Sequence, residues 1–172
     1  MKSIVALLAI FALVGPGIAN AASSEGADTY IGLQFGNSDV SVDGISDLDL
    51  DVTLLQVGVW VSDDISVEIR TGRGMSDDTV QGVKFEIESV YGLYGLYHFH
   101  LSEFASLYGA LGMSRATLKT SAAGTSDQDE ESSLSFGVGA KFSFFSVDFM
   151  RYMDTTDVEA DVVSVGLQYT FD

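Results

Sequence analysis

The end of the sequence alternates between large apolar residues and small or polar ones, and this pattern limits what the chain can fold into. In the stretch 164–171 every second residue is apolar, with Val165, Leu167, Tyr169 and Phe171 at these positions. Because the side chains of a β-strand point to opposite faces in turn, the stretch predicts a strand with one apolar and one polar face. Such a strand belongs in a sheet that separates two unlike environments.

The same alternation recurs along most of the sequence and predicts a series of strands. Long connections, rich in acidic residues, alternate with short connections along the chain. Eight strands are predicted, at 30–36, 52–61, 65–72, 85–99, 107–117, 134–142, 147–153 and 164–171. Long loops are predicted at 37–51, 73–83 and 119–133, short turns at 62–64, 101–104 and 144–146, and a brief acidic loop at 155–161.

An even number of strands with alternately long and short connections is typical of an outer-membrane barrel. In such barrels the short turns face the periplasm and the longer loops face the cell exterior. The pattern therefore predicts an all-β fold, an eight-stranded antiparallel up-and-down transmembrane β-barrel. Both ends of the mature chain are expected on the periplasmic side.

The first 21 residues have the layout of a cleaved secretory signal peptide. Lys2 precedes an apolar run at 4–14, a Gly-Pro-Gly segment interrupts it, and an A-x-A cleavage site ends at Ala21. The competing interpretation is an uncleaved anchor, but the run is shorter than the roughly 20 apolar residues that a spanning helix needs. The sequence therefore predicts a signal peptide at 1–21 and one outer-membrane barrel domain at 22–172.

The composition excludes several classes of protein. The chain of 172 residues has no cysteine, so its core or the membrane must stabilise it after export, without disulfides. The formal net charge of -17 argues against nucleic acid as a partner, because phosphates are bound through Lys and Arg. A mean hydropathy of +0.25 is high for so acidic a chain, and alternating strands with charged loops explain both values.

The alternation alone leaves open which face of the barrel is outside. A soluble barrel of lipocalin type would turn its apolar face inward and its polar face to water. The membrane orientation is favoured because small residues suit a lumen that eight strands make only just wide enough for its own side chains. Tyr169 and Phe171 also fall where an interfacial aromatic belt is expected. The polar face is rich in Ser and in glycines, namely Gly58, Gly92, Gly112, Gly137, Gly139 and Gly166.

In the membrane orientation, the charged residues of the polar face point into the lumen. Buried charges are tolerable only when they are paired and hydrogen-bonded, so an internal ion network is predicted. Its members are Glu68, Arg70, Glu86, Glu88, Lys141 and Asp148. Arg70 and Lys141 are each expected between carboxylates, beside Gln56, Trp60, Tyr94 and Tyr152. The network either plugs the lumen, which its small width favours, or lines a path for protons or ions. Arg151, on the outer face, is expected to extend toward the interface.

No catalytic residue, metal site or cofactor is predicted. His98 and His100 lie on one side of a strand and could form half of a metal site, but no third histidine and no cysteine completes it. A Ser-His-acid enzyme needs these groups at the external rim, whereas both histidines fall at the predicted periplasmic end. The acidic stretches 39–51 and 127–131 could hold divalent cations. They lack the spacing of a calcium loop, and solvated loops are the simpler interpretation.

With these features, the chain resembles the small outer-membrane β-barrel family, the OmpA/OmpX-like barrel domain often labelled porin family protein. The likeness spans 30–172 and includes the terminal motif Gly166-x-x-Tyr169-x-Phe171. In the family this motif is an insertion signal, so the resemblance implies that Gly166, Tyr169 and Phe171 serve the barrel-assembly machinery. Asp172 is a departure, because family members commonly end on Phe itself.

The resemblance also implies a location, partners and classes of function. The expected location is the outer membrane of a Gram-negative bacterium, with the protein a monomer surrounded by lipid and lipopolysaccharide and helped by periplasmic chaperones during assembly. One class of function is a structural or surface-interaction barrel with acidic external loops. The alternative is a narrow porin-like channel for ions or small solutes. A lipid-modifying enzyme is a distant third, and the chain is not expected to be an enzyme.

Overall fold

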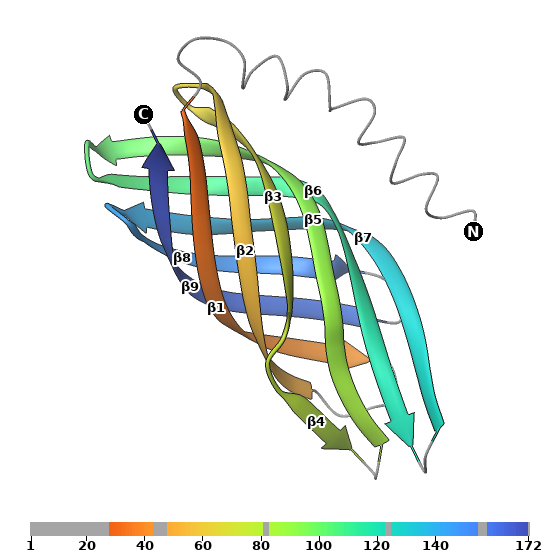
Figure 1. Cartoon of the computed structure of the whole chain (residues 1–172). Helices are drawn as coiled ribbons and strands as arrows, with labels where there is room; N and C mark the ends of the chain where they lie inside the picture. The colour runs from red at the N-terminus through yellow and green to blue at the C-terminus, as the bar shows by residue number, and fades with distance from the viewer. Residues whose placement is uncertain (1–27, 43–47, 81–82, 123–124, 155–157, 172) are drawn as a thin grey trace.

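Figure 1 shows the computed structural model, which describes residues 28–42, 48–80, 83–122, 125–154 and 158–171. The predicted signal peptide at 1–21 and Asp172 lie outside these residues. No helix within the described ranges is long and apolar enough to span a membrane. The described strands are β1 (Thr29–Val42), β2 (Leu48–Ser62), β3 (Ile65–Gly74), β4 (Asp77–Val80), β5 (Val83–Ser102), β6 (Ala105–Ala122), β7 (Thr125–Phe142), β8 (Phe145–Asp154) and β9 (Val158–Phe171).

These strands belong to one antiparallel sheet that closes on itself. Strands that follow one another pair, except that β3 pairs with β5, and β9 returns to pair with β1. β4 follows β3 after Met75 and Ser76 and pairs with the same strand, β5, so it continues β3. The ring therefore has eight strand positions, and the predicted eight-stranded up-and-down barrel is confirmed (Figure 1).

The two ends of the barrel differ. At one end the strands are joined by tight turns at 63–64, 103–104 and 143–144, and Thr29 and Phe171 pair with each other there. We call this the turn end. We call the opposite end, where the longer hairpins lie, the hairpin end.

The strands extend further at the hairpin end than the sequence predicts. The stretches 37–51, 73–83 and 119–133, predicted as loops, are largely strand. β1 and β2 pair as far as Val40 and Leu48, and β6 and β7 pair along their full length. Alternation is a signal only where the two faces of a strand meet different surroundings. In 119–133 every residue is small or polar, so a strand there looks like a loop in the sequence.

Part of the sheet at the hairpin end extends past the last described pair of β7 with β8. The described residues of β8 pair with β7 only from Phe136 to Phe142, whereas β7 continues on β6 to Thr125. The outer parts of β5, β6 and β7, with β4 beside them, extend together at the lower right of Figure 1. We call residues 77–80, 83–90, 115–122 and 125–133 the protruding sheet.

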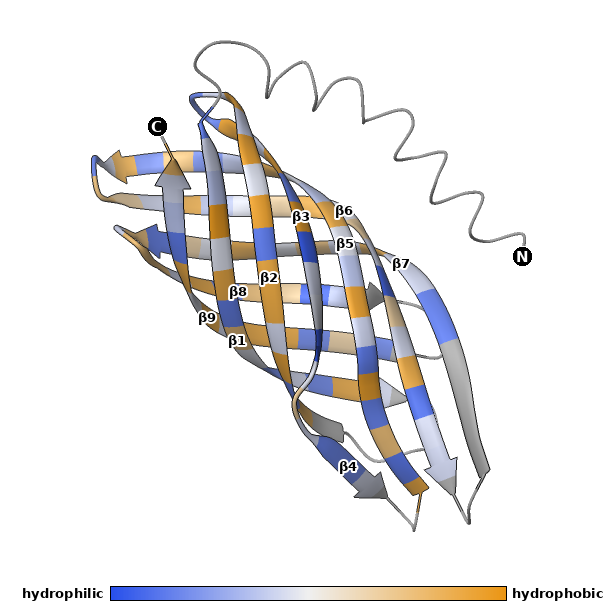
Figure 2. Ribbon diagram, in the orientation of Figure 1, coloured by the Kyte–Doolittle hydropathy of each residue, from blue (hydrophilic) through white to orange (hydrophobic). Residues whose placement is uncertain are grey.

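The apolar face of the barrel is outside and the polar face lines the lumen. Leu33 and Val165 are 40% and 56% exposed, whereas Gln34 and Arg70 are fully buried. Figure 2 shows the resulting alternation of hydrophobic and hydrophilic residues along the strands. Aromatic side chains gather at the turn end, as expected of an interfacial belt. Exposed members include Phe99, Phe104, Phe142, Phe144, Tyr169 and Phe171.

The lumen has two sections along its axis. The section toward the turn end is polar and is described below. The section toward the hairpin end is apolar and encloses a cavity of about 30 Å³. The sequence analysis did not predict this apolar section, whose buried residues include Val40, Leu50, Val52, Ile87, Val90 and Val162.

Candidate functional site: the polar plug in the lumen

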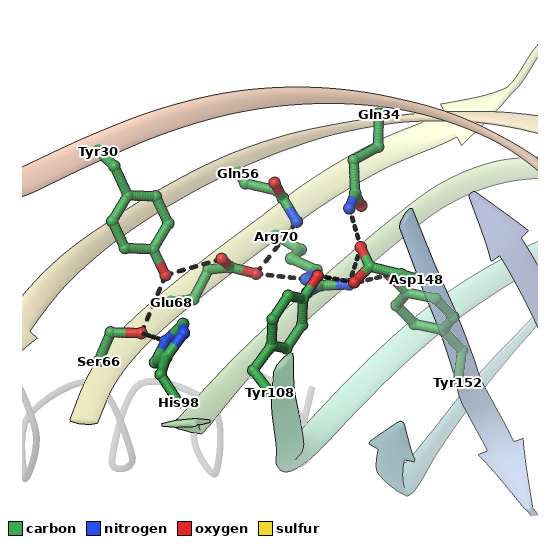
Figure 3. Close-up of polar contacts among 10 residues, drawn as sticks. All are labelled: Tyr30, Gln34, Gln56, Ser66, Glu68, Arg70, His98, Tyr108, Asp148 and Tyr152. Atoms are coloured by element: carbon green, nitrogen blue, oxygen red, sulfur yellow. Dashed lines mark hydrogen bonds and ion pairs between the residues drawn. The ribbon is translucent and has the colours of Figure 1, made fainter. Parts of the chain in front are cut away.

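The candidate site is a cluster of polar side chains in the polar section of the lumen, which we call the polar plug (Figure 3). Each member alternates with outward apolar residues on its strand, so the strand pattern turns it inward. Six strands contribute, because β1, β2, β3, β5, β6 and β8 all face the same axis. The members are Tyr30, Gln34, Gln56, Ser66, Glu68, Arg70, His98, Tyr108, Asp148 and Tyr152.

Arg70 lies at the centre of the polar plug. Its Nε donates to Oε1 of Glu68, and its Nη1 lies 3.6 Å from Oδ2 of Asp148. Nη1 also donates to the Tyr152 hydroxyl at 3.2 Å, and Cζ lies 5.2 Å from the ring centre of Tyr94. An unpaired buried carboxylate is very costly, so the arginine makes the burial of both acids tolerable.

Glu68 is held by a chain of hydrogen bonds on the turn-end side. Tyr30 donates to Oε2 at 2.8 Å, and Gln56 Nε2 donates to Oε1 at 3.3 Å. Because the Tyr30 proton is used, the Ser66 hydroxyl at 3.1 Å must donate to Tyr30. The Nε2–H of His98 then donates to Ser66 at 2.9 Å. The chain runs in one direction, from His98 to Glu68.

Asp148 is held from the opposite side of the lumen. Gln34 Nε2 donates to Oδ2, and the Tyr108 hydroxyl donates to Oδ1. Together with Arg70, these bonds connect β1, β3, β6 and β8 across the barrel. Hydrogen bonds to an ionised group are stronger than neutral ones, so the connection is a strong one.

The large rings of the polar plug fit because glycines face them. A Cβ atom at Gly139 would overlap the Tyr108 ring and the carboxylate of Asp148. We expect Gly139→Ala to lower the free energy of unfolding by about 1–3 kcal/mol, because these groups must shift out of their hydrogen bond. Urea unfolding in lipid vesicles measures the change. Gly109→Ala is the matched control, since a Cβ there meets no atom within 4 Å; equal losses in both variants would contradict tight packing.

The structure brings together three of the six residues predicted for the lumen network, namely Glu68, Arg70 and Asp148. Lys141 faces the lumen nearer the turn end and is half-buried, with its Nζ 3.5 Å from Oγ1 of Thr170. Among the described residues, no carboxylate lies within salt-bridge distance of this ammonium group. Lys141 therefore does not lie between carboxylates, in contrast to the prediction.

Glu86 and Glu88 do not face the lumen, and this corrects their predicted place in the network. The pairing of β5 with β6 shifts between Ile87 and Ser89, so Glu88 is the extra residue of a β-bulge. The bulge reverses the alternation beyond it. Ile87 is buried and faces the lumen, while Glu88 is exposed. The predicted inward direction of these two residues depends on unbroken alternation along the strand, and the sequence carries no signal for the extra residue.

The two histidines lie in different surroundings. His98 is buried in the polar plug, whereas His100 is exposed at the turn end, 3.4 Å from Asp64. The part of the chain that the structure describes contains no group of three or more His, Cys, Asp or Glu that could hold a metal ion. Trp60 packs beside both imidazoles, with ring centres 4.3 Å and 6.1 Å away.

The residues predicted as the insertion signal lie on β9. Tyr169 and Phe171 are exposed on the outer wall, and Gly166 faces the lumen opposite Gln34. Their role in assembly stays a prediction. Arg151, also on the outer face, donates from Nε to Asp161 at 2.7 Å.

The sequence analysis missed Tyr30, Gln34, Ser66, His98 and Tyr108 as members of the polar plug. The signal for them was present, because each falls on the polar face of its strand. Their partners lie far away in the sequence, as Gln34 and Asp148 do at a separation of 114 positions. Only the closed register of the barrel brings such pairs together.

A closed β-barrel with an apolar outer band and ion pairs in its lumen is the architecture of an outer-membrane protein. The chain belongs to the family described as outer membrane protein beta-barrel domain, whose profile matches residues 4–171. The comparison with curated protein sequences gave no match.

Solved outer-membrane barrels share the fold. Ail, the attachment invasion locus protein of Yersinia pestis, is 22% identical with a TM-score of 0.64, covering 84% of this chain and 99% of Ail. Neisserial surface protein A is 14% identical with a TM-score of 0.67, covering 85% of this chain and 99% of that protein. The N-terminal barrel of Pseudomonas aeruginosa OprF is 13% identical with a TM-score of 0.58, covering 84% of this chain and 100% of that domain.

Proposed function

We propose that the protein is a closed structural barrel that presents an acidic sheet at the cell surface. The observation that carries this proposal is the polar plug. Arg70, Glu68 and Asp148 are 0%, 2% and 1% exposed, and they connect opposite walls of the lumen. An eight-stranded barrel is only wide enough for its own side chains, so a network of this extent closes it.

The apolar section gives a second barrier to ions. Its cavity of about 30 Å³ is lined by groups such as Val52, Ile87 and Val162, which offer no hydrogen bonds to water. A cavity of that volume has room for about two water molecules, and apolar cavities stay dry. A hydrophobic constriction stops ions because they cannot shed their hydration there.

The protruding sheet supports the surface role. With both termini in the periplasm, this sheet lies on the external side of the membrane. It includes the acidic stretch 127–131 of a chain that carries 25 acidic and 8 basic residues. The described residues of β8 pair with β7 only as far as Phe136, whereas the outer part of β7 continues along β6. A cationic protein or peptide is the partner that such a surface would attract.

The same barrel architecture supports a proposed location and proposed partners. The exposed apolar band is surrounded by lipid and lipopolysaccharide, the barrel is a monomer, and the terminal motif is read by the assembly machinery. The name of the Yersinia pestis barrel describes attachment and invasion by that protein. At 22% identity the likeness to it carries over the fold alone.

A narrow channel is the second candidate, favoured by the ionised groups within the lumen. In planar lipid bilayers, the refolded mature protein is expected to show no steady conductance, because the polar plug and the apolar section are both closed. Steady open channels in the wild-type protein would contradict a closed lumen and favour the channel function.

The surface role is tested on whole cells. Cells that carry the full protein are compared with cells that carry a variant whose residues 117–130 are replaced by a short turn. The proposal expects adhesion to a cationic surface to fall in the variant, with equal amounts of both proteins in the outer membrane. Unchanged adhesion would count against the protruding sheet as the interacting surface.

A further inference from the structure

A bowl opens at the turn end of the barrel, on the opposite side of the polar plug from the apolar section. Its volume is about 660 Å³, within the range of sites for small ligands. The lining mixes aromatic rings with hydrogen-bonding groups. Its members include Trp60, His100, Ser106, Lys141, Gln168 and Thr170.

Lys141 is the charged group that distinguishes this bowl. Three arginines lie within salt-bridge distance of a carboxylate, namely Arg70 in the lumen and Arg115 and Arg151 on the outer face. Lys141 has no such partner among the described residues, and its Nζ reaches only Thr170 at 3.5 Å. A half-buried ammonium group without a carboxylate at salt-bridge distance has lost hydration that its surroundings only partly compensate. In so acidic a chain, an unpaired lysine in a bowl indicates a place for an anion.

Further hydrogen-bond donors lie beside Lys141. Ser146 is its direct partner across the β7–β8 pairing, and the Ser146 side chain is 3% exposed. In the described part of the chain, its buried hydroxyl has no hydrogen-bond partner. Gln168 and Thr170 line the bowl from β9. Among the described lining residues only Glu103 is acidic, and it lies in the exposed turn at the rim.

Trp60 supplies an apolar wall to the same bowl. Its ring is fixed by the His98 and His100 rings, whose centres lie 4.3 Å and 6.1 Å away. One lysine matches the single charge of a carboxylate better than the double charge of a phosphate. The hydroxyl, amide and aromatic groups around it suit a peptide.

We propose that the bowl binds the terminal carboxylate of a short peptide, with Lys141 as its counter-ion and Trp60 packed on the neighbouring residue. This site goes beyond the proposed surface function and lies at the other end of the barrel. With the turn end in the periplasm, two sources carry this chemistry. They are the stem peptides of the cell wall and the C-termini of periplasmic proteins.

The test uses Trp60 as a reporter, because it is the only tryptophan of the chain. The mature protein in zwitterionic nanodiscs is titrated with N-acetyl-dialanine as the free acid and as its C-terminal amide. We expect the acid to change the tryptophan emission until the site is saturated. The amide is expected to bind at least about tenfold more weakly, because it cannot form the charge-assisted bond to Lys141. Equal binding of acid and amide would overturn the proposal.

Three variants sharpen the test. Lys141→Gln is expected to weaken binding of the acid about tenfold, and Lys141→Arg to restore it. Lys119→Gln, at the hairpin end, removes the same charge far from the bowl and is expected to bind like the wild type. Heat-dependent gel mobility checks that each variant is folded. Wild-type affinity in Lys141→Gln would contradict the site.

Two further comparisons identify the ligand's source. Tighter binding of the peptide with D-alanine residues assigns the site to the cell wall, and tighter binding of the L-form assigns it to protein C-termini. Asp172→Asn tests whether the chain's own last residue takes the place of the ligand. Binding by Asp172→Asn alone, with none by the wild type, would overturn the proposal.

Discussion

Replacing Arg70 by methionine is expected to lower the free energy of unfolding by about 3–5 kcal/mol. The variant keeps most of the side-chain volume but leaves the carboxylates of Glu68 and Asp148 buried without their cation. Adding Glu68→Gln and Asp148→Asn to Arg70→Met is expected to recover part of the loss, because neutral amides need no counter-ion. Urea unfolding in lipid vesicles, followed by tryptophan emission, measures both changes.

Arg115→Met is the matched control for this prediction. Arg115 pairs with Glu130 on the protruding sheet, where the glutamate side chain is 47% exposed. Water screens such a pair, so its loss is expected to cost about 1 kcal/mol or less. Losses of similar size at Arg70 and Arg115 would contradict the central role of the polar plug in stability.

Replacing Val165 by arginine is expected to lower the free energy of unfolding by about 2–4 kcal/mol in a bilayer. Val165 is 56% exposed and lies one outward position from Leu167, the middle of the apolar outer band, which on β9 runs from Val163 to Phe171. Its neighbours across the sheet are Phe35 and Val147. A charge at this depth loses its hydration to the lipid chains.

Asp63→Arg controls for the new charge itself. Asp63 lies in the exposed turn between β2 and β3, where arginine stays hydrated. The change there is expected to stay within about 0.5 kcal/mol. A harmless Val165→Arg would mean that this wall does not face lipid.

The sequence predicted the barrel well because two unlike media impose a strict alternation. Leu33 and Gln34 show this, since from Tyr30 to Phe35 the residues of β1 face the lumen and the apolar outer wall in turn. The strand count followed from this alternation, whereas the outward direction of the apolar face followed from the small residues of the polar face and from the terminal aromatic residues. The pairing of Arg70 with its two carboxylates also followed, because buried charges need partners.

The remaining features could not be predicted from alternation. The bulge at Glu88 is a local change of phase that moves Glu86 and Glu88 outward and Ile87 inward. The apolar section arises where the alternation is reversed, as at Val40, an inward apolar residue between the outward polar residues Asp39 and Ser41. The Lys141 side chain faces the lumen as predicted. Whether a carboxylate lies beside it depends on the register of β7 with β8 and on the position of β9.

The protruding sheet is built from the same strands as the membrane wall, with no joint between them. β6 pairs with β7 through all eighteen residues of each strand, from the tip of the hairpin to the turn. A tensile load applied at the tip would act along the strand axes, so the backbone hydrogen bonds would share it in shear. A contact made at the tip is therefore anchored mechanically by the whole length of the hairpin, and its strength does not depend on a hinge.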